Sequence, residues 1–172
     1  LPIETMDYKI YNLDVLKISI IRATAINLGY ILGKLQFLDI KSMGIYKLYD
    51  GKKFFQIEFG QNVDEEDIPF IQSILDDSTK MENKVQLKKP NIRKDEIEID
   101  CNHTKSLAQM KVSTYDQKGL FSYIAAVFDD FGIEIQSAKI HTTRNKVDDL
   151  FLIEKNGKFC DQKEEILTQL TF

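Results

Sequence analysis

The sequence is poor in the residue types from which catalytic and metal centres are usually built. Its histidines are His103 and His141 and its cysteines are Cys101 and Cys160, and they form neither a Cys-x-x-Cys motif nor a cluster at metal-ligand spacing. A nucleophile beside a base and a glycine-rich phosphate loop are also missing. We therefore expect no catalytic residue, no metal and no cofactor in this chain.

Excess positive charge and long apolar runs are missing as well. The net charge of -4 argues against a nucleic-acid partner, because a phosphate backbone selects a basic surface. No apolar run approaches the roughly 20 residues of a membrane span, so we expect no membrane association. Hydrophobic residues make up 43% of the 172 residues, enough for a packed core in one large domain or two small ones.

Neither an initiator methionine nor a signal peptide is present at Leu1-Pro2-Ile3-Glu4. We interpret the chain as a piece of a longer protein. With only two cysteines, we expect both to be reduced thiols in a cytoplasmic protein.

The second half of the chain has the clearest pattern. Between Leu120 and Phe131 apolar residues recur on one helix face, and Gly132 follows where a C-terminal cap belongs. The apolar positions of residues 133–143 change parity, which predicts a strand with a bulge near Gln136. The elements predicted for this half are strands at 96–101, 107–114, 133–143 and 146–154, turns at Arg144-Asn145 and Lys155-Asn156-Gly157, and helices at 120–131 and 161–170.

The first half repeats this order about 94 residues earlier, as the hairpin turn Asp50-Gly51 shows. Asp67 and Pro69 indicate the start of its second helix. We predict strands at 8–11, 16–21, 37–48 and 53–59 and a first helix at 25–36. The domains are then residues 1–77 and 95–172, joined by a solvated linker at 78–94 in which residues 84–87 form a short strand.

Each half therefore predicts an α+β, ferredoxin-like domain: a four-stranded antiparallel sheet with two helices on one face. In the second half the leading strand at 96–101 takes the edge position. Leu150 and Leu152 point to the face opposite Phe151 and Ile153, so the face without helices is partly apolar and needs a partner. The two halves can pack side by side or face to face, or two chains can form a homodimer.

Two segments of the second half resemble a known family. Asp116-Gln117-Lys118-Gly119-Leu120-Phe121 resembles the D-x-x-G-L loop of ACT domains. The hairpin Ala138-Lys139-Ile140-His141-Thr142-Thr143 and Val147-Asp148-Asp149-Leu150-Phe151 is similar to one in the last ACT domain of the bifunctional uridylyltransferase and uridylyl-removing enzyme. The similarity covers residues 95–170, whereas the first half matches only in layout and in its hairpin.

The resemblance implies a function in nitrogen regulation. In that family the C-terminal ACT pair senses glutamine and controls the nucleotidyltransferase and hydrolase domains, which modify the PII signal protein. Those domains would precede Leu1. The chain would then be an allosteric region without activity of its own in a cytoplasmic enzyme, with glutamine, the catalytic domains and PII as partners.

The candidate ligand-binding residues are Tyr115, Asp116, Gln117, Lys118, Gly119 and Leu120. Backbone amides at the helix start suit the carboxylate of an amino acid, and Gly119 lets the ligand approach closely. Asp116 suits the ammonium group. The alternative is structural: Asp116 caps the helix and Gly119 permits the turn. The adjacent Asp148 and Asp149 point to opposite strand faces and form no catalytic pair.

The first half lacks the acid and the glycine, since Ile21-Arg22-Ala23-Thr24 stands in their place. We predict that this loop does not bind an amino acid in the same way. It is then structural, or it forms one wall of the other domain's pocket. The competing functional hypothesis is a ligand-free interaction module that docks on the catalytic domains, on PII or on another copy.

Overall fold

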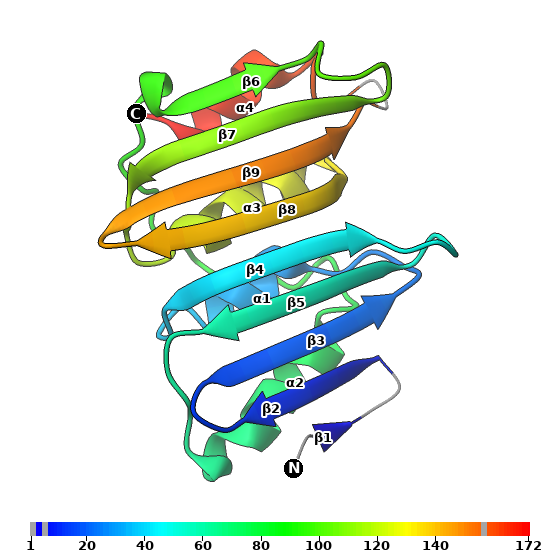
Figure 1. The fold of residues 1–172 in the computed structure, drawn as a ribbon, viewed down its shortest axis with the longest axis vertical. Helices are drawn as coiled ribbons and strands as arrows, with labels where there is room; N and C mark the ends of the chain where they lie inside the picture. Colours follow the sequence, from blue (N-terminus) through cyan, green and yellow to red (C-terminus); the bar gives the residue numbers. More distant parts are fainter. Residues whose placement is uncertain (1–2, 5–6, 156–157) are drawn as a thin grey trace.

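The computed structural model describes residues 3–4, 7–155 and 158–172, and in this part of the chain nine strands form one antiparallel sheet (Figure 1). Their order is β1-β2-β3-β5-β4-β8-β9-β7-β6. The strands are β1 Ile3–Glu4, β2 Tyr8–Asn12, β3 Leu16–Arg22, β4 Ile40–Lys47, β5 Lys53–Phe59, β6 Ile97–Asp100, β7 Leu107–Tyr115, β8 Ile135–Thr143 and β9 Lys146–Glu154. The predicted turn at 155–157 lies largely outside the described residues.

We call the elements from β1 to α2 (Ile68–Asp77) the first unit and those from β6 to α4 (Lys163–Leu170) the second unit, and the two units share this sheet through β4 and β8. The register places Ser42 opposite His141 and Ile45 opposite Ala138. The prediction of two separate four-stranded sheets is wrong in this respect. An uncovered strand edge presents unpaired N–H and C=O groups, and here each unit covers the edge of the other. The predicted edge position of β6, beside β7, is confirmed.

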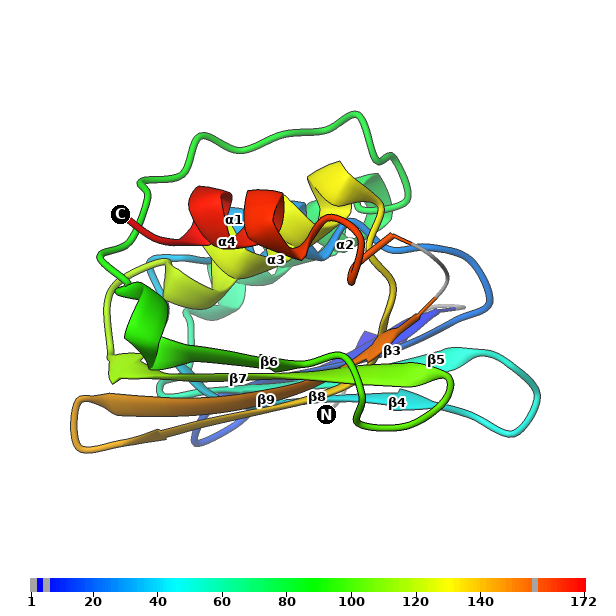
Figure 2. The same ribbon diagram turned by 90° about the horizontal axis from the view of Figure 1, so that it is seen from above.

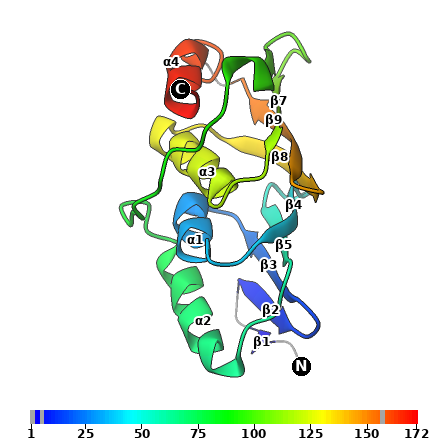
Figure 3. The ribbon, with the colours of Figure 1, turned by 90° about the vertical axis from the view of Figure 1, so that its left-hand side faces the viewer.

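All helices of the described residues lie on one face of the sheet, and the other face is bare (Figures 2 and 3). They are α1 Leu28–Lys34, α2 Ile68–Asp77, α3 Leu120–Phe131 and α4 Lys163–Leu170, with short 3-10 turns at Glu65–Asp67 and Lys94–Glu96. None of them has the length and apolar character that a membrane crossing requires. The units therefore lie side by side, and neither covers the bare face of the other.

The helix layer is also continuous across the junction, because α1 packs directly on α3. A Cβ added at Gly29 would lie 2.7 Å from the Ala126 Cα, so only glycine permits this approach. The Gly29 amide donates to Asp129 Oδ2 at 3.1 Å, which ties the start of α1 to α3. Sheet and helices thus hold the junction from both layers.

The connection between the units runs over the helices on the side away from the sheet (Figure 2). It has no strand at residues 84–87, so that prediction is wrong. Nor is it wholly solvated: Ile92 is fully buried and accepts a bond from the Phe172 amide, and Asn27 donates to Lys80 and Asn83 carbonyls. The segment thus forms backbone and side-chain bonds with both units.

Several local predictions are confirmed. The register between β8 and β9 shifts between Ile135 and Ser137, where the bulge was expected. Gly132 is the left-handed C-cap of α3, with φ 65°. Arg144 and Asn145 have φ 49° and 64°, as a tight hairpin turn requires. The helix predicted at 25–36 is shorter and spans Leu28–Lys34.

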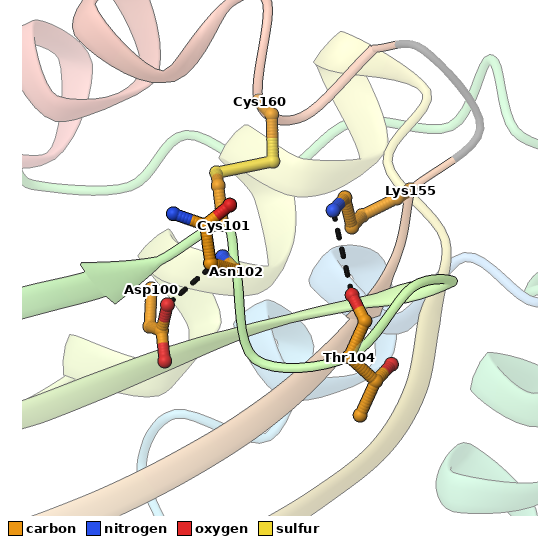
Figure 4. Close-up of a disulfide and its surroundings, with 6 residues drawn as sticks. All are labelled: Asp100, Cys101, Asn102, Thr104, Lys155 and Cys160. Atoms are coloured by element: carbon orange, nitrogen blue, oxygen red, sulfur yellow. Dashed lines mark hydrogen bonds between the residues drawn. A yellow bond between two sulfur atoms is a disulfide. The ribbon is translucent and has the colours of Figure 1, made fainter.

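Cys101 and Cys160 are joined by a disulfide bond (Figure 4). Cys101 directly follows β6, and Cys160 lies in the turn that leads into α4. Their Cα atoms are 6.1 Å apart, within the range that a disulfide spans. The expectation of reduced thiols is wrong, because the fold joins the sheet edge to the last helix and brings together residues 59 positions apart.

Replacing both cysteines by serine should lower the free energy of unfolding by about 2–4 kcal/mol, because the bond restricts a loop of 59 residues in the unfolded chain. Urea denaturation of the wild type and the double variant, each with and without a reducing agent, measures this loss. The reducing agent should destabilise the wild type and leave the variant unchanged. A wild type indifferent to reduction would contradict the bond.

Candidate functional site

A cavity of about 240 Å³ lies at one end of the junction, and we call it the Asp149 cavity. The first unit supplies residues 36–40, between α1 and β4, and the second supplies residues 116–122, between β7 and the first turn of α3. Its remaining lining residues are Ile140, Thr142, Val147 and Asp149 of the hairpin β8–β9. Because both units form its walls, the cavity exists only where they meet.

Five of the six predicted ligand-binding residues line this cavity, namely Asp116, Gln117, Lys118, Gly119 and Leu120. Tyr115 does not. Its side chain is 66% exposed, and the ammonium of Lys146 lies over its ring at 5.7 Å from the centroid. Tyr115 is the last residue of β7, and strand alternation turns it away from the helix-facing Thr114. Tyr115 therefore lies outside the Asp149 cavity, and its part in ligand binding stays a prediction.

The corner between β7 and α3 is built around Gly119, which has φ 75° and is the N-cap residue of α3. Its predicted role in permitting the turn is confirmed, since L-residues with a side chain rarely adopt this conformation. The alternative in which Asp116 caps the helix is wrong, because Gly119 occupies that position. Asp116 is instead exposed at the rim of the cavity.

Two of the predicted ligand contacts are already engaged within the protein. The Leu120 amide donates to the Gln117 carbonyl at 3.1 Å and closes the turn. The Gln117 side chain accepts from the Asn91 amide at 2.8 Å and donates to the Asn91 carbonyl at 3.0 Å. The backbone N–H groups of Lys118 and Gly119 remain available to donate hydrogen bonds to a ligand carboxylate.

Sequence reasoning missed Asp149, the most unusual group in the cavity. It lies on β9 between Val147 and Phe151, and all three side chains face the helices. Asp149 is only 3% exposed, and neither carboxyl oxygen forms a hydrogen bond of standard geometry with the described residues, although the backbone N–H of His141 is close enough to act on it. Its pKa is raised to about 8, mainly by burial; the backbone N–H of His141 lowers the pKa, and the negative charges of Asp148 and Asp116 add to the increase.

Asp148 points to the bare face, where it accepts a bond from Ser113 Oγ at 2.9 Å, so the predicted divergence of the two adjacent acids is confirmed. That parity contained the missed signal. Phe151 and Ile153 were predicted to share one strand face, and two residues earlier the same parity places Asp149 on that face.

The cavity is lined by more acidic than basic side chains. Asp39, Asp116 and Asp149 line it, against Lys118 alone. The pKa of Asp116 is raised by partial burial and by the charge of Asp39. Within the described ranges no group of three His, Cys, Asp or Glu side chains is close enough to hold a metal ion. The arrangement therefore suits an organic cation better than a metal, with backbone amides nearby for an attached anionic group.

No known protein-family profile matches the chain. Its fold is similar to that of the aspartate kinase from Synechocystis, with a TM-score of 0.51 and 14% sequence identity. The similarity covers 91% of this chain but 26% of the kinase, so this chain spans about a quarter of that protein's length. The likeness shows an ACT-like fold.

We expect Asp149→Asn to stabilise the protein as the pH rises. The pKa of Asp149 is about 8 in the folded state, whereas an aspartate in an unfolded chain titrates near pH 4. Between these values the unfolded state has lost a proton that the folded state keeps, so the wild type loses stability with rising pH. The variant has no such proton, and its advantage should grow by up to ~1.4 kcal/mol per pH unit.

Urea denaturation at about pH 5, 6, 7 and 8 measures this advantage, since the range lies between the two pKa values. Asp148→Asn, which alters the neighbouring acid on the opposite face, is the matched control. A pH-independent difference between Asp149→Asn and the wild type would mean that Asp149 is not held neutral by burial.

Proposed function

We propose that this chain is a regulatory region that binds a free amino acid in the Asp149 cavity. The observation that carries the proposal is a buried carboxyl group without a hydrogen bond of standard geometry, beside a cavity that also contains the glycine corner. A buried polar group without a partner costs about 1–3 kcal/mol or more. A ligand cation would remove that cost. A purely structural cavity has no use for a buried acid.

The two ends of an amino acid match the two sides of the cavity. Its carboxylate would accept from the amides of Lys118 and Gly119, at the positive end of the α3 dipole. Its ammonium would lie at Asp149, which would give up its proton to solvent on binding, and Asp116 would add negative charge from the rim. Phe37, among the apolar lining residues of the first unit, would contact the side chain of the ligand.

Regulation would follow from the position of the cavity. A ligand there contacts both units, so it binds more tightly to the relative placement of the units that fits it best. That difference in affinity is the free energy available to shift an attached enzyme between states. Ligand binding in the Asp149 cavity would thus change the relative placement of the two units.

The resemblance in residues 116–121 and in the hairpin β8–β9 supports a more specific proposal. The ligand would be glutamine, and the parent protein a cytoplasmic nucleotidyltransferase of nitrogen regulation that modifies PII. In that proposal this chain has no catalytic residues or cofactor of its own, and the parent is the enzyme. The Cys101–Cys160 disulfide argues against the cytoplasmic part of this proposal, because such bonds are rare in reducing compartments.

Titration calorimetry with glutamine and a panel of other amino acids tests the proposal. Asp149→Asn should weaken binding about tenfold or more, since it removes a charge-assisted contact of about 1.5–3 kcal/mol. Asp148→Asn is the matched control and should bind as the wild type does. Heat from other amino acids but not from glutamine would refute the uridylyltransferase proposal and leave the sensor. No heat from any amino acid at millimolar concentration would refute both.

The bare sheet face supports the second candidate function, an interaction module. Ile21, Phe54 and Tyr46 lie side by side there, since Phe54 is the cross-strand partner of both others. Ile21 and Tyr46 are 45% and 40% exposed. Apolar side chains gathered on an uncovered face are typical of a docking surface.

If a second copy docks on this face, Tyr46→Glu should raise the dimer dissociation constant about tenfold or more by placing a charge in an apolar contact. Analytical ultracentrifugation over a concentration series measures this constant. The variant should keep the amino-acid affinity of the wild type, because Tyr46 is not among the residues that line the Asp149 cavity. A wild type that stays monomeric at high concentration would exclude the homodimer.

A further inference from the structure

The Cys101–Cys160 disulfide joins the two outermost elements of the second unit. β6 ends directly before Cys101, is the last strand in the order of the sheet and pairs with β7 alone. α4 begins shortly after Cys160 and packs on α3. The bond therefore ties the edge of the sheet layer to the edge of the helix layer (Figure 4).

The two ends of α4 are held in different ways. At its end, the Phe172 amide donates to the Ile92 carbonyl at 3.2 Å, and the Tyr123 hydroxyl donates to the Gln169 carbonyl at 2.9 Å. Its start has no capping side chain, and among the described residues the segment 158–165 forms no hydrogen bond with another element. The disulfide and the packing of buried side chains therefore hold the start of α4.

Phe159, the residue before Cys160, begins a row of aromatic rings through the core of the second unit. It is fully buried and packs edge-on against Phe128 of α3, with ring centroids 6.2 Å apart. Phe128 packs edge-on against Phe151 of β9 at 5.8 Å, and Phe151 stacks on Phe121 at 5.7 Å. Phe121 lies in the first turn of α3 and lines the Asp149 cavity. Ring contacts thus lead without a gap from the disulfide to the wall of the cavity.

This aromatic row can transmit a displacement. Because a protein core is close-packed, a shift of Phe159 must be accommodated by the rings beside it. The start of α4 is the segment from which such a shift can come, since no hydrogen bond fixes it to a neighbouring element. The disulfide limits the shift by fixing Cys160 to the sheet edge.

The bond lies where a reductant can reach it. Cys101 and Cys160 are both partly exposed, at the side of the second unit that faces away from the first. A thiolate of a dithiol would attack one sulfur and form a mixed disulfide, and the second thiol of the reductant would then close the reductant's own disulfide. The dithiol loses two electrons, and the two cysteines gain them and are released as thiols.

We propose that the Cys101–Cys160 bond is a redox-sensitive latch, which a dithiol opens in the folded protein and which, when closed, fixes the start of α4 and the aromatic row. When the latch is open, β6 and α4 open locally, and the ring of Phe121 changes its position at the wall of the Asp149 cavity. The latch does not depend on which ligand the cavity binds.

Amide hydrogen exchange at several low urea concentrations tests the latch in the oxidised and the dithiothreitol-reduced 172-residue chain. A local opening exposes little surface, so its rate depends weakly on urea, whereas global unfolding depends on it strongly. Reduction should accelerate exchange in β6 and α4 about tenfold or more without urea, and with a weak dependence on urea. An acceleration with the same urea dependence in α4 as in β3 and β5 would mean that the bond only stabilises the whole fold.

Aromatic NMR of the same samples tests the row of rings. Reduction should shift the ring signals of Phe121 in the wild type. In Phe159→Leu, which keeps the bond and removes one ring, reduction should still open α4 but should leave the Phe121 signals in place. The double variant Cys101→Ser, Cys160→Ser is the control, and it should resemble the reduced wild type with or without dithiothreitol.

Two results in the wild type, which need no variant to fold, would overturn the proposal. One is a bond that millimolar dithiothreitol leaves closed while the sheet amides stay protected, as thiol alkylation and mass spectrometry would show. The other is a Phe121 ring signal that is identical in both redox states. A Phe121 shift that persists in Phe159→Leu would refute the aromatic row as the route.

Discussion

The antiparallel pairing of β4 with β8 is the interaction on which the rest of the structure depends. It satisfies two strand edges at once and extends one sheet through both units. It also places all helices in one layer, where α1 and α3 pack closely at Gly29 and Ala126. The Asp149 cavity is a consequence of this pairing, because it takes walls from both units.

The order of the elements could be read from the sequence because it depends on local patterns. The second strand of each hairpin was predicted at 53–59 and 146–154, the bounds that β5 and β9 have in the structure. The helical stripe gave α3, and a parity change gave the bulge beside Ile135. The joining of the two sheets through β4 and β8 could not be predicted from the sequence, because two strands that pair edge to edge leave no shared pattern in their residues.

The candidate site divides in the same way. Its corner was predictable, because Gly119 and the residues beside it form one continuous motif. Residues 36–40, which form the opposite wall, come from the other unit and gave no signal of their own. Strand parity puts Asp149 on the same face as Phe151, but an acid at that position is normally exposed, and its burial follows from the packing of the helices on that face. The disulfide escaped notice for the same reason, since it joins two segments 59 positions apart.

The close approach of Gly29 to Ala126 has a mechanical consequence. With backbone this near to backbone, and β4 paired with β8 in the sheet, the units have little room to slide past each other. The Asp149 cavity lies past the end of α1, and a second cavity, of about 400 Å³, lies beside its start, on the opposite side of this contact. A rotation of one unit about this contact would widen one cavity and narrow the other.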